Sequence, residues 1–476
     1  MSGANTQQKN EKTELKIRHW PEPSLLFTRG QTERIIDPKH GLIKFGPHDY
    51  NVNLRNFDEV RIKVICYKHA NYPITILNLV ENLKKEFISK FKTLKSYPYK
   101  GFENIYRAGL ETPKSERELL PISNTEILNI MNTNNFQEFL SKFKELYSQK
   151  IQDIIDMGYS TNTVIYVHIP PNLEKKFSSF KETRNIIGIG LRGVIKVMAI
   201  KKSVKTQVIT EKSLSPPDIA DTLWNLSLAT YVKAGGSPWK LKEIPPASLF
   251  MGIRHGIRRD EKGQIIAIGI AELFNRYGEH VDIIAVNFKD RDMLNPELWR
   301  SKPYLSFEGM KKIISKAISR WKNELNSVVI HRTLDFKEEE IEGALSALQS
   351  TEQIDMLHII ENTDTRIFLD QLDTKRGTFF PLEDKRGLLY TTGYSEAENM
   401  YPGIGTPKPL ELIKYYGETD IEVLSQQVLA LTKMDWNTTR VMLREPVTIK
   451  YAKKVTDIIK LGPKSEAPIR DIRFYF

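Results

Sequence analysis

Three apolar segments succeed one another in the second half of the chain and decide its fold: SLFMGI (248–253), QIIAIGIAEL (264–273) and HVDIIAVNF (280–288). Each is rich in branched aliphatic residues and has the length of a strand. Short polar stretches with turn-forming residues separate the three segments. The stretch therefore predicts three successive antiparallel strands.

The sequence that follows alternates helices with strands. FEGMKKIISKAISRWKNEL (307–325) has the spacing of an amphipathic helix, and SVVIHR (327–332) reads as a strand. KEEEIEGALSAL (337–348) predicts a second helix and IDMLHIIEN (354–362) a further strand. Three antiparallel strands followed by helix, strand, helix and strand are the element order of an RNase H-like fold.

The first half of the chain predicts a separate α/β layer. DEVRIKVICY (58–67), NTVIYVHIP (162–170) and TQVIT (206–210) are typical of strands, and helical patterns cover 74–94 and most of 125–158. This alternation predicts a Rossmann-like parallel sheet covered by helices. Residues 24–47 are interpreted as short strands with turns.

These patterns divide the chain into three parts. The polar stretch at 1–20 lacks the apolar centre of a signal peptide and is expected to be a disordered lead-in. The Rossmann-like domain, with an N-terminal extension, is expected over 21–245. The RNase H-like domain is expected over 246–476.

Composition narrows the class of protein. The 476 residues carry 70 Lys and Arg against 59 Asp and Glu, a formal charge of +11, which favours a polyanionic partner such as nucleic acid. Cys66 is the single cysteine, so an intrachain disulfide and a cysteine metal site are excluded, as suits the cytoplasm. No apolar run approaches the roughly 18 residues that span a bilayer.

Four polar residues stand out within apolar, structured sequence: Arg192, Lys196, Gln207 and Lys233. The first two are one helical turn apart and share a face, Gln207 lies near the start of a strand, and Lys233 lies in the last turn of a helix. No acidic residue occurs between residues 185 and 210. Cations and an amide donor suit an anion with several oxygens, such as a terminal phosphate. The alternative is four cations or donors that merely face water on separate helices.

The same residues carry a resemblance to a known family. Together with YVKAGGSPWKL (231–241), LTKMDWNTT (431–439), EPVTIKYAKKV (445–455), the ending RFYF and an early GLIKFGP, they resemble a short prokaryotic Argonaute. Such a protein consists of a MID domain, which is the Rossmann-like part, followed by an RNase H-like PIWI domain. The likeness is strong from about residue 185 to the end.

The resemblance implies a role for the four polar residues. In the family, a MID pocket of this pattern holds the 5′-phosphate of a guide strand. Here that role falls to Arg192, Lys196, Gln207 and Lys233. The terminal carboxylate, here that of Phe476, folds into the pocket and in many members helps to hold a divalent cation. Because a carboxylate beside a phosphate would repel it, either a bound Mg²⁺ at the 5′ end of the guide or the lysines must neutralise the pair, and no organic cofactor is expected.

The resemblance also implies a loss of cleavage activity. Family nucleases cut with carboxylates that hold two Mg²⁺ ions. Arg254 stands where the first carboxylate is expected, on the first PIWI strand, and Thr333 stands where the second is expected, after SVVIHR. The last ligand lies near Asp435 or Asn437, and the sequence does not decide between them.

Three functions remain open at this level. The leading hypothesis is a guide-loaded module, with RNA as guide and single-stranded DNA as target, that recognises the target without cutting it. The resemblance then implies a partner protein in which a PAZ-analogous region is joined to an effector (a TIR domain, a sirtuin-like enzyme or a nuclease) for defence against plasmids or phages. The alternatives are a Mg²⁺-dependent guided endonuclease with relocated carboxylates, Asp335 or Asp260, and an RNase H-fold protein that binds a nucleotide.

Overall fold

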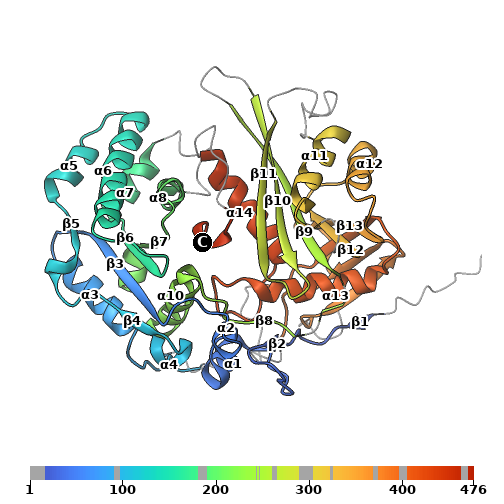
Figure 1. The fold of residues 1–476 in the computed structure, drawn as a ribbon, viewed down its shortest axis with the longest axis horizontal. Helices are drawn as coiled ribbons and strands as arrows, with labels where there is room; N and C mark the ends of the chain where they lie inside the picture. The colour runs from blue at the N-terminus through green and yellow to red at the C-terminus, as the bar shows by residue number, and fades with distance from the viewer. Residues whose placement is uncertain are drawn as a thin grey trace, which may run out of the picture.

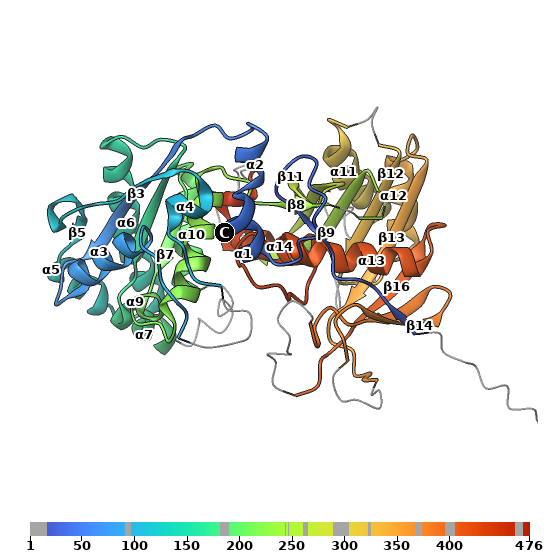
Figure 2. The same cartoon turned by 90° about the horizontal axis from the view of Figure 1, so that it is seen from below.

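The structure is a computed structural model that describes residues 17–90, 97–180, 190–242, 244–245, 247–259, 265–288, 304–321, 325–367, 374–395, 405–461 and 470–476. Two lobes, each built on one sheet, make up the molecule (Figure 1). The first lobe spans residues 59–241 and the second lobe spans residues 247–476. The end of the chain lies between the two lobes in both views (Figure 2).

The first lobe contains the predicted parallel sheet. Its strands are β3 (Glu59–Tyr67), β4 (Gly109–Glu111), β5 (Leu120–Ile122), β6 (Thr163–His168) and β7 (Thr206–Ile209). They run in the order β4-β3-β6-β7, β5 also pairs with β3, and every pairing is parallel. Every residue of β6 is buried, as expected for a strand that is covered by helices on both faces.

Alternate residues of β6 enter two separate cores. Val164 and Tyr166 pack with α3 (Tyr72–Asn82) and α10 (Ile219–Ala234), whereas Ile165 and Val167 pack with α6 (Phe136–Asp156) and α8 (Gly190–Lys201). The two-residue period of a strand therefore sorts apolar side chains to both faces. The remaining helices of this lobe are short: α4 (Phe102–Tyr106), α5 (Asn124–Met131), α7 (Pro171–Ser179) and α9 (Glu211–Leu214).

The second lobe contains the predicted RNase H-like order. β9 (Leu249–Arg259), β10 (Ile265–Asn275) and β11 (His280–Phe288) are antiparallel neighbours. β12 (Ser327–Arg332) runs parallel to both β9 and β13 (Gln353–Ile360). The sheet continues through β16 (Leu410–Tyr416), β15 (Arg386–Leu389) and β14 (Thr378–Glu383).

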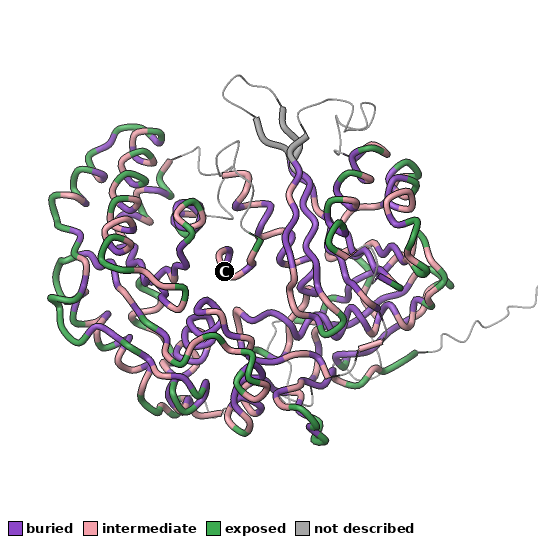
Figure 3. Tube along the Cα trace, in the orientation of Figure 1, coloured by how far each residue is buried: buried purple, intermediate pink, exposed green. Residues whose placement is uncertain are grey.

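Helices cover both faces of this larger sheet, whose central strands are buried (Figure 3). α11 (Phe307–Ile318) and α12 (Glu338–Ala347) share a core with Met251 and Ile253 of β9. α14 (Val447–Leu461) packs against the opposite face of β9, and α13 (Ile421–Leu431) lies against β14, β15 and β16. α14 also touches α8 of the first lobe, so this helix borders both lobes.

Three expectations for the N-terminal region need correction. Residues 38–45 form a helix, α1 (Pro38–Phe45), because the Asp37 side chain caps the first turn. Pro38 takes the first helical position, where a backbone N–H would have no hydrogen-bond partner within the helix. The helix expected over 74–94 ends at Asn82 within the described residues. Part of the expected lead-in is ordered, since β1 (Arg18–His19) pairs with β14; residues 1–16 lie outside the described residues.

The N-terminal extension ties the two lobes together. β2 (Leu25–Leu26) pairs with β8 (Lys240–Leu241), which lies between the two sheets in sequence. The Glu22 carboxylate lies 2.8 Å from Nε of Arg376 and 2.6 Å from Nζ of Lys433, and all three groups are at least nine-tenths buried. A buried carboxylate with two cationic partners is strongly held, since removing one member leaves an uncompensated charge.

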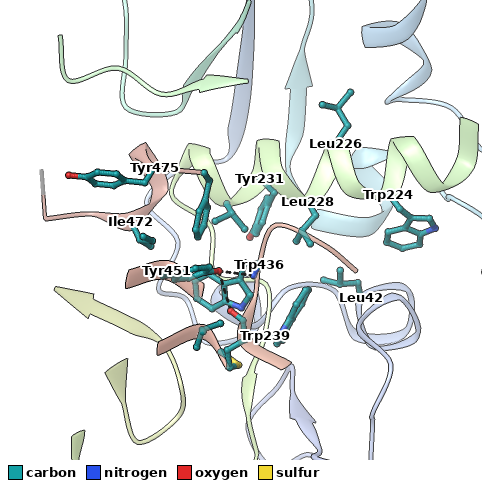
Figure 4. Packing of buried hydrophobic residues seen from close by; sticks show 14 of the residues in the cluster. Leu42, Trp224, Leu226, Leu228, Tyr231, Trp239, Trp436, Tyr451, Ile472 and Tyr475 are labelled. Carbon is teal, nitrogen blue, oxygen red and sulfur yellow. Dashed lines mark hydrogen bonds between the residues drawn. The ribbon is translucent and has the colours of Figure 1, made fainter. Parts of the chain in front are cut away.

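A continuous apolar core crosses the boundary between the lobes. Trp224 and Tyr231 of α10 belong to the same apolar cluster as Trp239, which precedes β8, and as Trp436 and Tyr451 of the second lobe (Figure 4). The expected domain boundary at 245/246 falls between β8 and β9, within this shared core. Across the described residues, no helix has both the length and the apolar character needed to cross a bilayer.

Candidate anion-binding pocket

A pocket of about 540 Å³ lies where the lobes meet, at the end of the chain. Its walls come from α8, β7, α9 and α10 of the first lobe, from α14 of the second lobe, and from residues near Asn437 and the end of the chain. The lining residues are Arg192, Gly193, Lys196, Gln207, Val208, Lys212, Ser213, Asp221, Thr222, Asn225, Leu226, Ala229, Lys233, Asn437, Lys454, Asp457, Ile458, Tyr475 and Phe476.

The structure brings all five residues of the predicted phosphate site into this pocket. Arg192 and Lys196 project from α8, Gln207 from β7, Lys233 from the last turn of α10, and Phe476 closes one side. Arg192 is exposed, whereas Lys196 and Lys233 are only 7% and 2% exposed. The arginine therefore stands at the mouth and the two lysines lie deep in the pocket.

Neutral groups hold these cations in place. Lys233 Nζ donates a hydrogen bond to Oε1 of Gln207, and Lys196 Nζ donates to the carbonyl of Thr206. Arg192 Nη2 donates to Oγ1 of Thr210 over 3.3 Å. Local sequence explains the positions: Arg192 and Lys196 are one turn apart on α8, and α10 ends after Lys233 because Gly235 adopts φ 119°.

Lys454 is a further cation that the sequence analysis missed. It belongs to α14 and lines the same pocket, with its Nζ 5.3 Å from the centre of the Phe476 ring. It lies within the quoted stretch EPVTIKYAKKV, but nothing in that stretch indicates which of its lysines faces the first lobe. Only the packing of α14 against α8 decides this.

The two carboxylates of the lining are already engaged by other lysines. Asp221 lies 3.4 Å from Nζ of Lys39, and Asp457 lies 3.7 Å from Nζ of Lys460. Within the described part of the chain, no ion pair within 4.0 Å joins a carboxylate to Arg192, Lys196, Lys233 or Lys454. The pocket thus presents four cationic side chains that make no ion pair within 4.0 Å with a carboxylate of the described residues, although Asp435 attracts Lys454 from a longer distance.

The pKa values of the lysines reflect this crowding. Burial, followed by repulsion from Lys454 and Arg192, lowers the pKa of Lys233 to about 7. Burial lowers the pKa of Lys454 to about 8, and burial with repulsion from Lys233 lowers the pKa of Lys196 well below its ordinary value. An anion in the pocket would favour the charged forms, so the site is built to receive one.

Phe476 is packed rather than mobile in this arrangement. Its side chain is 5% exposed, and its ring lies 5.0 Å from that of Tyr451. The preceding turn, η5 (Ile472–Phe474), contacts α8, α10 and β11. The last residues of the sequence are therefore inserted between the lobes, as the resemblance implied.

The side chains of the pocket do not fit a resident magnesium ion. Mg²⁺ takes six oxygen ligands in near-octahedral geometry. The side-chain carboxylates of the lining, Asp221 and Asp457, are each paired with a lysine, and the other charged side chains of the lining are cations. In the described ranges, no three His, Cys, Asp or Glu side chains are grouped as metal ligands would be.

Arg254 lies in β9, and Thr333 directly follows the end of β12 in the second lobe. β9 and β12 run parallel, and Gly252 opposite His331 is the last pair of their register. The side chains of Arg254 and Thr333 are both partly exposed. The two positions that the resemblance equated with the first two catalytic carboxylates thus lie two residues beyond this last pair, one in each chain segment.

Neither Asp435 nor Asn437, the two residues considered for the last metal ligand of the catalytic site, offers an unpaired carboxylate. Asp435 is 1% exposed, accepts a hydrogen bond from the Tyr451 hydroxyl at 3.1 Å and lies 2.5 Å from Nζ of Lys450. Asn437 lines the anion-binding pocket instead. The sequence could not choose between the two because their opposite surroundings arise from packing.

Of the two acids considered for a relocated catalytic site, Asp335 is already paired and Asp260 is not described. Asp335 accepts a hydrogen bond from Tyr304 and lies 2.8 Å from Nζ of Lys337, which together hold the pKa of its carboxyl at about 2 against the opposing effect of burial. Asp260 lies outside the described residues. One acidic pair was not predicted from the sequence: Glu361, which follows β13, and Glu445 both contact Lys453 of α14.

Comparison with known proteins agrees with this geometry. A family described as the Piwi domain matches residues 191–462. "Protein argonaute" of Aquifex aeolicus (strain VF5) is 26% identical over 288 residues, which cover 59% of this chain and 37% of that protein. The chain belongs to the Piwi domain family, and its curated relative in that family is an Argonaute.

Solved Argonautes share the fold over nearly the whole chain. The crystal structure of A. aeolicus Argonaute matches with a TM-score of 0.60 and 19% identity, over 94% of this chain and 54% of that one. Clostridium butyricum Argonaute, bound to a guide DNA and a 19-mer target DNA, matches with a TM-score of 0.64 and 16% identity, over 97% and 55% of the two chains. The present chain spans about half the length of these proteins, and the PIWI part has the expected RNase H-like fold.

Proposed function

We propose that this protein binds the 5′-phosphate of a short guide strand in the anion-binding pocket and uses the guide to recognise a complementary strand. The observation that carries this proposal is the convergence of Arg192, Lys196, Gln207 and Lys233, from three separate elements, on one pocket beside Phe476. Arg192 has the planar donor set that suits two phosphate oxygens, and the lysines act as point charges. A terminal phosphate carries a charge of about −2 at neutral pH.

We further propose that the protein does not cut its target. Two-metal cleavage requires carboxylates that hold Mg²⁺ on both sides of the scissile phosphate. Arg254 in β9 and Thr333 after β12, a cation and a neutral hydroxyl, stand where the resemblance places the first two of these carboxylates. Arg254 would repel a divalent ion, and it is well suited to contact the phosphate backbone of a guide–target duplex.

The identities of guide and target rest on the resemblance to short prokaryotic Argonautes. RNA as guide and single-stranded DNA as target are our choice on that ground, and C. butyricum Argonaute, which is similar in fold, holds both a guide and a target. Base pairing would read the sequence while the protein reads the backbone. A partner with a PAZ-analogous region and an effector would convert recognition into cytoplasmic defence against plasmids or phages.

Guide loading is tested by charge reversal. We expect Lys196→Glu with Lys233→Glu to abolish preferential binding of 5′-phosphorylated over 5′-hydroxyl strands, because like charges would face the phosphate. The matched control reverses Lys68 and Lys175, two exposed lysines outside the pocket lining. Fluorescence anisotropy with both strand types is the measurement. Equal affinity for the two strand types in the unmutated protein would exclude the proposed pocket function.

Cleavage is tested separately. We expect no cut in a matched RNA or DNA target, with either Mg²⁺ or Mn²⁺, when the guide-loaded protein is assayed on sequencing gels. A clean cut opposite the guide would favour the relocated-carboxylate nuclease. Failure to recover any short 5′-phosphorylated strand with the purified protein, together with nucleotide binding, would favour the third function.

A further inference from the structure

We propose that this pocket binds the terminal phosphate without a divalent metal ion, because Lys454 of α14 lines the pocket beside Phe476 and supplies the neutralising charge there. The inference rests on the proposed guide-binding function. Of the two ways to neutralise the phosphate, Mg²⁺ or lysine, it selects lysine, and it assigns a phosphate-binding role to a residue of the second lobe.

The position of Lys454 is fixed by the second lobe. α14 begins against β9, where a Cβ on Gly252 would lie 2.0 Å from the carbonyl oxygen of Thr448. One turn later the hydroxyl of Tyr451 is buried and donates to Asp435, and the Tyr451 ring packs on Phe476. Lys454 follows Tyr451 by three residues and so projects from the same side of α14, towards the pocket.

The charge balance favours lysine over metal. Arg192, Lys196, Lys233 and Lys454 supply four positive charges when protonated, and the paired carboxylates of Asp221 and Asp457 do not offset them. A terminal phosphate brings about two negative charges. The phosphate and the carboxylate of Phe476 together are therefore matched by the side chains alone, and a divalent ion would add repulsion with Lys454.

The ligand geometry points the same way. A magnesium ion bridging the phosphate and a carboxylate needs room for several waters in an octahedral shell. In this pocket the neighbourhood of Phe476 is occupied by the Lys454 ammonium, which lies over the aromatic ring, and by Tyr475 and Ile458. These groups offer a compact positive charge and apolar surface rather than further oxygen ligands.

The test compares binding with and without metal. A fluorescent 5′-phosphorylated strand and its 5′-hydroxyl counterpart are titrated with the full chain in excess EDTA and in excess Mg²⁺. We expect the same preference for the phosphorylated strand in both conditions. Lys454→Met should reduce that preference about tenfold or more in EDTA, as expected for one charge-assisted contact, while Lys454→Arg should retain it. Lys385→Met, an exposed lysine outside the pocket, is the control.

Each outcome bears on a different claim. A phosphate preference that disappears in EDTA would overturn the metal-free inference and leave the proposed function standing. A missing preference in every condition would remove the proposed function itself. Should Lys454→Met fail to fold, as judged by thermal unfolding, the EDTA comparison on the unmutated chain decides the inference alone.

Discussion

Lys233→Met should make the unliganded protein more stable and the guide complex weaker. Lys233 is 2% exposed, its Nζ donates to Gln207, and it faces Lys196, Lys454 and Arg192 without a carboxylate partner within 4.0 Å in the described residues. Methionine fills a similar space without charge. A residue that is retained for binding and opposes folding is expected to show both effects at once.

The gain in stability follows from the pKa. Lys233 titrates at about 7 in the folded protein, below its ordinary value of 10.5, so the folded state disfavours the charged form. Each pKa unit corresponds to about 1.4 kcal/mol, which sets an upper limit on the order of 4 kcal/mol near pH 7. The lost hydrogen bond to Gln207 offsets about 1 kcal/mol. We expect the free energy of unfolding to rise by roughly 1–3 kcal/mol.

The loss of affinity follows from the missing charge. A hydrogen bond from a charged donor contributes about 1.5–3 kcal/mol, so the Kd for a 5′-phosphorylated strand should rise about 10- to 150-fold. The Kd for the 5′-hydroxyl strand should stay nearly unchanged. Denaturant titration and fluorescence anisotropy measure the two effects on the same preparation. A variant that is less stable than the parent, or that keeps its full phosphate preference, would refute the reasoning.

Four further predictions follow from contacts described above. Binding a 5′-phosphorylated strand should take up protons between about pH 7 and 8, because the phosphate restores charge to Lys233 and Lys454, and calorimetry in two buffers of different ionisation enthalpy measures the uptake. Since the folded pKa of Lys233 is lowered, the free energy of unfolding of the unliganded protein should rise as pH increases from about 7 towards 10.5, which denaturant titration can follow. Glu22→Gln should destabilise the protein by about 3–5 kcal/mol in denaturant, because two buried cations lose their counter-ion. Gly252→Ala should lower both the free energy of unfolding and the affinity for phosphate, since the added Cβ would displace α14 at the Thr448 carbonyl. An unchanged affinity for phosphate would show that the position of Lys454 does not depend on this contact.

The spacing of apolar residues along the sequence predicted much of the fold. The branched, apolar segments around 249–288 and 327–360 predicted the strands and helices of the RNase H-like order, and the structure confirms them. Local cues failed where a short apolar run fits either structure. GLIKFGP looked like strand and turn, but the Asp37 cap and Pro38 start a helix there. The two-residue strand β1 has no local signature, because only its pairing with β14 defines it.

The sequence also predicted part of the candidate anion-binding pocket. Arg192 and Lys196 share a helix face by spacing alone, and Gly235 marks the end of the helix that carries Lys233. The sequence did not predict that α14 contributes a cation to the pocket. Lys450, Lys453 and Lys454 look alike in sequence, but the first pairs with Asp435, the second with Glu361, and the third enters the pocket.

The sequence by itself therefore determined the element order, the class of both sheets and the chemistry of an anion site, because periodicity and side-chain type are local properties. Only the tertiary structure decided that cations from positions 192 to 454 meet in one pocket beside Phe476, and that Asp221 and Asp457 of this pocket pair with other lysines. The physical reason is that these relations depend on the docking of α14 between two lobes, which joins residues more than 200 positions apart.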